Sequence, residues 1–155
     1  MRALALLAVL ALAPSSALAD FVGRVVRVSD GDTLTVLVNN AQIRIRLDAI
    51  DAPELKQAFG SRSRQSLAEL CAAKTARVVE RGRDRYGRTV GVIVCDGVDA
   101  NAEQVRRGMA WVFDRYVTPT SPLYGLQAEA RVTRRGLWAD PHPLAPWDWR
   151  RRARS

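Results

Sequence analysis

Histidine and cysteine are scarce in this chain of 155 residues, which has one histidine, His142, and two cysteines, Cys71 and Cys95. The cysteines form no C-x-x-C pair and no cysteine–histidine cluster is present, so a zinc site is not supported. His142 lies between two prolines near the C-terminus, which makes it a poor candidate for a catalytic base. Lysine is also rare, with Lys56 and Lys74 as its only members. The positive charge is therefore carried almost entirely by arginine.

The formal net charge is +8, from 24 lysine and arginine residues against 16 acids. A guanidinium group presents a planar fork of donors that matches pairs of phosphate oxygens. This balance favours an anionic partner, with DNA or RNA as the leading candidate. The alternative is that the arginine excess reflects coding bias and solubility.

The sequence lacks the run of about 20 apolar residues that a membrane-spanning helix needs. The shorter apolar run 3–13 follows Arg2 and precedes a Pro-Ser-Ser-Ala-Leu-Ala segment. This pattern predicts a signal peptide over residues 1–19. We therefore expect a periplasmic or secreted protein with no stable membrane association after cleavage.

An exported chain favours a disulfide between Cys71 and Cys95, although two buried free thiols are the alternative. The length fits one domain, expected over residues 20–140. We expect the protein to be a monomer. Residues 141–155 form a tail rich in proline, tryptophan and arginine. We expect Arg150–Arg154 to be solvated. The tryptophans of the tail are expected to pack onto the domain, with base stacking as the alternative.

Hydrophobic alternation and turn residues predict five short strands and three helices. The strands are expected at 21–28, with a break at Gly23, and at 34–38, 43–47, 76–81 and 89–95. The helices are expected at 61–73, from Asp99 or Asn101 to Arg107, and from Pro122 to Gly136. Because the first helix falls between the third and fourth strands, the fold class is α+β, mainly β, with a five-stranded OB-type Greek-key barrel and three helices.

Four acids stand at predicted strand ends and turns, namely Asp30, Asp32, Asp51 and Glu54. Carboxylates gathered at one end of a barrel repel one another unless a cation lies among them. Oxygen ligands without imidazole or thiolate favour Ca²⁺, and Mg²⁺ less so. The alternative is that Asp-Gly forms a simple hairpin turn and that the Asp-Ala-Pro-Glu segment caps a helix.

Arginine accompanies these acids, with Arg46 five residues before Asp51 and Arg88 at the end of the Asp-Arg-Tyr-Gly turn. Hydrolysis of a phosphodiester requires neutralisation of the phosphate charge and an activated water. A divalent ion and two guanidinium groups supply the first requirement, and Glu54 is placed to supply the second.

Three segments together resemble the staphylococcal nuclease (thermonuclease) family, and the resemblance extends to Trp138. They are Val28–Thr33, Ile45–Glu54 and Asp84–Arg88, in the same order and spacing. The resemblance implies an OB barrel with three helices. It also implies Ca²⁺-dependent endonucleolysis of DNA and RNA to products with 3′-phosphate ends.

Carried over by motif position, the resemblance implies that Asp32 and Asp51 bind Ca²⁺ through their carboxylates and Ala52 through its carbonyl. Asp30 would act near the ion through water. Glu54 would be the general base, or would orient the attacking water, while Arg46 and Arg88 hold the phosphate.

For substrate binding, the resemblance implies roles for Arg85, Tyr86 and Tyr116. Asp114 replaces the first of two aromatic residues along the substrate groove, and the loop 55–60 is shorter than in the best-known member. A noncatalytic OB-fold nucleic-acid-binding module is the rival function, although binding alone gains nothing from a carboxylate cluster facing phosphate.

Overall fold

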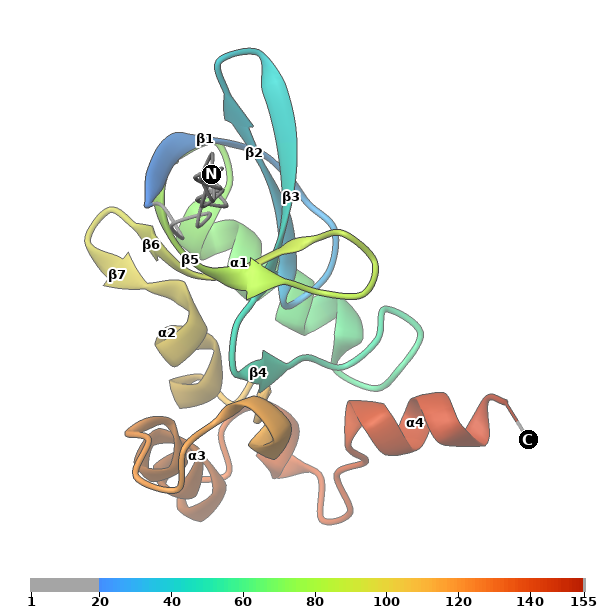
Figure 1. Cartoon of the computed structure of the whole chain (residues 1–155). Helices are drawn as coiled ribbons and strands as arrows, with labels where there is room; N and C mark the ends of the chain where they lie inside the picture. The colour runs from blue at the N-terminus through green and yellow to red at the C-terminus, as the bar shows by residue number, and fades with distance from the viewer. Residues whose placement is uncertain (1–19, 155) are drawn as a thin grey trace, which may run out of the picture.

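The structure, a computed structural model, describes residues 20–154. The predicted signal peptide 1–19 lies outside the described residues. Figure 1 shows a barrel of strands with helices gathered along one side and one end. The strands are β1 (Phe21–Val28), β2 (Thr33–Val38), β3 (Ala41–Leu47), β4 (Ile50–Asp51), β5 (Thr75–Arg83), β6 (Thr89–Cys95), β7 (Val98–Asp99) and β8 (Trp111–Val112).

Four α-helices occur within the described residues, where the sequence predicted three. They are α1 (Gly60–Cys71), α2 (Ala100–Arg106), α3 (Leu123–Val132) and α4 (Pro146–Arg152). The additional helix, α4, lies in the tail, and Pro146 begins it because proline is tolerated in a first helical turn. Short 3-10 helices span Asp114–Tyr116 and Gly136–Ala139.

Five strands close into the barrel that the sequence predicted. Their order is β3-β2-β1-β5-β6, with antiparallel neighbours throughout. A parallel pairing of β3 with β6 closes the ring, and it sets Arg46 opposite Val90. The α+β, OB-type fold class is therefore confirmed.

The hairpin between β2 and β3 forms as the sequence pattern requires. Asn39 and Asn40 both adopt positive φ, at 47° and 64°, which a two-residue hairpin turn demands and asparagine tolerates. The turn fixes a register that pairs Leu34 with Ile45, and both side chains are fully buried in the core. The same register places Arg46 opposite Thr33, next to the Asp-Gly-Asp turn.

The irregularity in β1 lies later than predicted. The register of β1 against β2 shifts between Val25 and Arg27, and not at Gly23. Gly23 instead allows a close approach of strands, because a Cβ there would lie 2.5 Å from the carbonyl oxygen of Leu37. Gly23 therefore indicates a close approach of two strand backbones, and the bulge lies elsewhere in β1.

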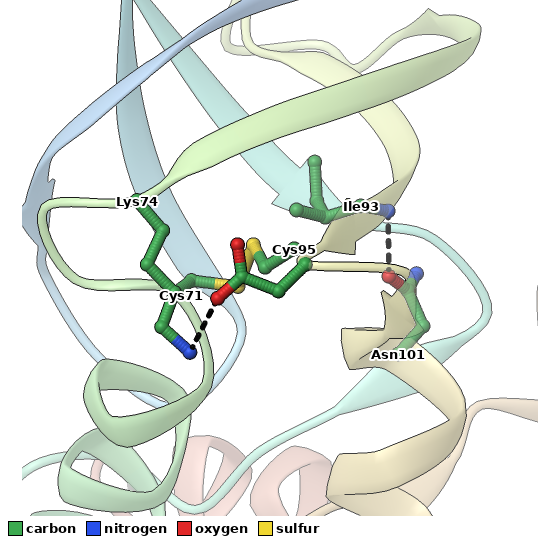
Figure 2. The surroundings of a disulfide bond; sticks show 6 residues. Cys71, Lys74, Ile93, Cys95 and Asn101 are labelled. Carbon is green, nitrogen blue, oxygen red and sulfur yellow. Dashed lines mark hydrogen bonds and ion pairs between the residues drawn. A yellow bond between two sulfur atoms is a disulfide. The ribbon is translucent and has the colours of Figure 1, made fainter.

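A disulfide joins Cys71, at the end of α1, to Cys95, at the end of β6, as expected from the sequence. Both half-cystines are fully buried. Figure 2 shows the bond beside an ion pair that joins Lys74 to Asp96 at 3.1 Å. The bond thereby fixes α1 against the strand that closes the barrel. Within residues 20–154, no helix has the length and apolar character for crossing a bilayer.

Candidate active site

Asp32 ends the turn between β1 and β2, and its carboxylate points into the protein. Gly31 is required in this turn because a Cβ there would lie 1.8 Å from Ser63 Oγ. Asp30 Oδ1 accepts a hydrogen bond from the Asp32 backbone N–H at 3.0 Å, which sets the turn. Asp32 Oδ2 accepts the backbone N–H of Ala52 at 2.6 Å. The first acidic segment is thus joined directly to the second.

Arg46 brings the two buried acids of these segments together. Its Nη1 lies 3.3 Å from Asp32 Oδ2, and its Nη2 lies 3.2 Å from Asp51 Oδ1. Asp51 lies on β4, which pairs with β8, and it is only 2% exposed. One guanidinium therefore bridges two carboxylates, as expected for groups that tolerate one another only around positive charge.

A second guanidinium, that of Arg150 on α4, completes the cluster. Its Nη2 lies 2.6 Å from Asp51 Oδ2 and its Nη1 lies 3.2 Å from Asp51 Oδ1, which makes a two-point ion pair. The same Nη1 lies 2.8 Å from Glu54 Oε1. The prediction of a solvated Arg150 is wrong, because α4 directs this residue onto the acids.

Burial raises the pKa of two acids in this region, Asp51 and Asp30. It raises the pKa of Asp51, an effect offset in part by the hydrogen bond from Arg150 and reinforced by the nearby Asp32 carboxylate. Burial and the Asp32 carboxylate together raise the pKa of Asp30 to about 6. Burial therefore opposes the ionised form of both carboxyls, and a nearby positive charge would stabilise it.

The oxygen atoms that this site offers are of the type that binds hard divalent cations. Asp32 and Asp51 supply carboxylate oxygens, and Ala52, which follows Asp51 in the chain, donates its backbone N–H to Asp32 Oδ2 at 2.6 Å. Within residues 20–154, no group of three or more His, Cys, Asp or Glu side chains is arranged as a ready metal cage. A cation here would accordingly rely on two carboxylates, a carbonyl and water, a ligand mixture typical of oxygen-bound ions.

The structure does not join Arg88 to the acid cluster, because its side chain is engaged by Asp84. Arg88 is the residue before β6, whose first residue, Thr89, pairs with Ile45 of β3, the neighbour of Arg46 in the chain. The Arg88 guanidinium is held by Asp84 in its own turn, with Nε 2.7 Å from Asp84 Oδ2. Reaching a phosphate between the two strands requires Arg88 to exchange this carboxylate for a phosphate oxygen.

A groove of about 660 Å³ is lined by Arg88 and by Tyr86, one of the two expected substrate-binding residues of this turn, and the other, Arg85, lies over the Tyr86 ring. Tyr86 is 67% exposed, and the guanidinium carbons of Arg85 and Arg88 lie 4.8 and 5.6 Å from its ring centre. Arg44 and Arg83 also line the groove. An exposed aromatic ring among guanidinium groups suits a strand of nucleotides.

Tyr116 is 65% exposed and lies edge-on to Phe113, with ring centres 5.3 Å apart. Asp114, at the position where the resemblance leads us to expect an aromatic residue, accepts a hydrogen bond from the Tyr124 hydroxyl at 2.8 Å. Asp114 thus stabilises the start of α3 and offers no stacking surface. Tyr116 is left as an accessible ring on this side of the molecule.

Sequence reasoning missed Arg150 entirely. The partners of this residue lie 99 and 96 positions away, so no local pattern links them. The one available signal was Pro146 followed by Trp-Asp-Trp, which reads as the start of a helix with an acid in its first turn. That signal predicts the helix but gives no indication of its place in the fold.

Comparison with known proteins points to one family. The model of a family described as staphylococcal nuclease homologue matches residues 44–140. The chain is 46% identical over 158 residues to a micrococcal nuclease of Shigella flexneri, covering 96% of this chain and 91% of that protein. It is 49% identical over 136 residues to an uncharacterised endonuclease of Escherichia coli O157:H7, covering 86% and 88%.

A more distant relative is a probable staphylococcal-like nuclease of Oryza sativa subsp. japonica. The identity is 36% over 133 residues, which covers 85% of this chain and 34% of the rice protein. The matched family segment includes Arg46, Asp51, Glu54 and Arg88. The chain therefore belongs to the staphylococcal nuclease family of phosphodiester hydrolases.

Proposed function

We propose that this protein is a Ca²⁺-dependent endonuclease that hydrolyses both DNA and RNA and leaves 3′-phosphate ends. The observation that carries the proposal is the convergence of Asp32 and Asp51 on Arg46, at 3.3 and 3.2 Å, with Glu54 joined to the same cluster through Arg150. Acids and arginines held together at the rim of a barrel are what cleavage of a phosphodiester requires and what binding alone does not.

The residues divide the work of in-line hydrolysis among them. Glu54 takes a proton from the attacking water, whose oxygen forms a bond to phosphorus while the bond from phosphorus to the 5′ oxygen breaks. Arg46 and Arg88 donate hydrogen bonds to the phosphate oxygens as their charge grows, with Arg88 on the side of the leaving 5′ oxygen. A divalent cation held by Asp32, Asp51 and the Ala52 carbonyl would neutralise part of that charge.

The absence of discrimination between DNA and RNA follows from the chemistry of the groups involved. Every group assigned above addresses phosphate or water, and none is assigned to the 2′-hydroxyl. Arg85, Tyr86 and Tyr116 would add contacts to phosphates and base faces, which both nucleic acids share. We further propose that the protein acts as a monomer, exported to the periplasm or beyond.

The decisive assay incubates the mature chain with single- and double-stranded DNA and with RNA, in Ca²⁺, Mg²⁺ or chelator. Glu54→Gln and Arg88→Ala are compared with Arg64→Ala, an exposed position on α1 that serves as the control. We expect cutting of all substrates in Ca²⁺ and a loss of about 100-fold or more in kcat for the two site variants. Undiminished cutting by both variants would contradict the mechanism.

The product ends give a second, independent readout. Fragments with 3′-phosphate ends serve as polymerase primers only after phosphatase treatment, whereas 3′-hydroxyl ends need none. A wild-type protein that binds nucleic acid but cuts nothing in Ca²⁺ would instead identify a noncatalytic binding module on the OB fold.

A further inference from the structure

The C-terminal helix α4 is anchored to the domain at its start. Trp147 stacks on Phe113, with ring centres 5.6 Å apart and planes 23° apart, and it meets Trp111 edge-on. The Leu144 carbonyl accepts a hydrogen bond from Gln57 Nε2 at 2.5 Å. Figure 1 shows α4, in red, beside the loop that follows β4. The tail is therefore held against the segment that carries Glu54.

This anchoring delivers one guanidinium, that of Arg150, to the acids. Arg150 lies one helical turn after Pro146, the first residue of the helix, which is itself buried. Arg150 makes a two-point ion pair with the buried Asp51. It also contacts the half-exposed Glu54. The side chain of Arg150 is 36% exposed, so it closes the solvent side of the cluster.

The charge balance shows what such a contact does to a metal site. The three acids that Arg46 and Arg150 contact, Asp32, Asp51 and Glu54, carry three negative charges, and the two arginines carry two positive ones. A divalent cation added with both arginines in place leaves the cluster with one excess positive charge. The cluster becomes neutral if Arg150 withdraws. A guanidinium and a divalent ion therefore compete for the same Asp51 oxygens.

We propose that Arg150 is a tethered competitor of the metal ion, which occupies Asp51 and Glu54 in the metal-free protein and leaves them when a divalent cation binds. The proposal rests on the metal requirement stated under Proposed function. It makes Arg150 the residue that sets the affinity of the site for its cation. Arg150 lies on α4 in the C-terminal tail, outside the barrel that carries the acids.

Withdrawal of Arg150 also changes the state of Glu54. While Arg150 Nη1 lies 2.8 Å from Glu54 Oε1, it competes with a water molecule for that oxygen. Release of Arg150 frees the Oε1 lone pairs of Glu54 to receive the proton of the attacking water. Arg150 thereby couples metal binding to the availability of Glu54 as a base. Glu54 does not activate water before the ion is bound.

The test measures Ca²⁺ binding by calorimetry on the wild type, Arg150→Ala and Arg152→Ala, without substrate. Arg152, exposed on the same helix, is the matched control because its removal costs the same formal charge. We expect Arg150→Ala to bind Ca²⁺ about tenfold more tightly and Arg152→Ala to stay within about twofold of wild type. Equal affinities for wild type and Arg150→Ala, or equal gains in both variants, would overturn the proposal.

A second experiment observes the Arg150 guanidinium directly by NMR. The side-chain NMR signals of Arg150, identified by their loss in Arg150→Ala, should be protected from exchange with water in chelator and lose protection when Ca²⁺ is added. Protection that persists in saturating Ca²⁺ would overturn the displacement. If neither wild type nor Arg150→Ala binds Ca²⁺, the calcium dependence fails and the proposal fails with it. If wild type binds and Arg150→Ala binds equally, only the role of Arg150 is lost.

Discussion

Arg46 and Asp51 lie five residues apart in the chain and meet at the barrel rim, where Arg46 Nη2 is 3.2 Å from Asp51 Oδ1. The register of β3 with β2 turns Arg46 toward Asp32 at the same time. Since β4 pairs with β8 and not with β3, the chain bends between the two residues and brings them face to face. One guanidinium thus connects both proposed metal ligands and, by the mechanism above, the phosphate.

Arg46→Ala should abolish most of the nuclease activity without weakening the metal site. Loss of one preorganised donor to the phosphate costs about 100- to 1,000-fold in kcat. Because Arg46 also neutralises Asp32 and Asp51, its removal should leave Ca²⁺ affinity equal or higher. Steady-state kinetics and calorimetry on one preparation measure the two effects. Activity within about threefold of wild type would remove Arg46 from the mechanism.

Gln104 should be a major support of the turn that carries Asp32. The side chain is fully buried, and its Nε2 donates to the carbonyl oxygens of Gly31, at 2.7 Å, and Ser63, at 3.0 Å. Gln104→Met keeps the volume but leaves both carbonyls without this donor. We expect the free energy of unfolding to fall by about 2–3 kcal/mol, measured by urea denaturation.

The matched control for Gln104 is Gln65→Met on the exposed face of α1, where Nε2 contacts Glu69 at 3.2 Å. This exposed change should alter the free energy of unfolding by less than about 0.5 kcal/mol. If the two variants lose the same stability, the hydrogen bonds of Gln104 do not hold the turn.

The Cys71–Cys95 disulfide should contribute strongly to stability. The two residues are 24 positions apart, and closing such a loop stabilises the folded state by about 3 kcal/mol through restriction of the unfolded chain. The oxidised protein should therefore unfold at a higher urea concentration than the protein reduced by dithiothreitol. A variant with alanine at both positions is the control, because the reductant should leave its midpoint unchanged. Identical urea midpoints for oxidised and reduced wild type would show that the disulfide does not contribute to the free energy of unfolding.

Asp48 should make stability depend on pH in a definite direction. Burial raises the pKa of its carboxyl above the ordinary 3.8, against opposing effects of the Ala49 backbone N–H and of Arg81 and Arg46. The folded state then binds more protons than the unfolded state between 3.8 and the folded pKa, so the free energy of unfolding falls as pH rises through that window. Asp48→Asn removes this dependence.

The measurement is the free energy of unfolding of Asp48→Asn minus that of wild type, from urea titrations in chelator between about pH 3.5 and 7. The difference should grow in favour of the variant as pH rises and then level off. Asp20→Asn, at an exposed carboxyl, is the control for general charge effects. A difference that stays constant with pH would contradict the assignment to Asp48.

Much of the barrel was predictable because its signals are local. Alternation of apolar residues in β2 and β3, with Asn39-Asn40 between them, specifies a hairpin without reference to the rest of the chain. The Asp-Gly-Asp turn and the Asp-Ala-Pro-Glu segment were found for the same reason. The bulge in β1 was misplaced because Gly23 serves strand contact, and contact distances are not visible in a sequence.

The amino-acid sequence by itself determined the five barrel strands, and the acids, Arg46 and Arg88 of the candidate site, since each rests on short-range pattern or on motif position. The disulfide was expected because a chain predicted to be exported has two cysteines. Only the tertiary structure decided that Arg88 pairs with Asp84 and that Arg150 pairs with Asp51 and Glu54. The physical reason is that an ion pair depends on where side chains meet in space. For Arg150, that meeting is set by the packing of Trp147 on Phe113, far from either acid in the chain.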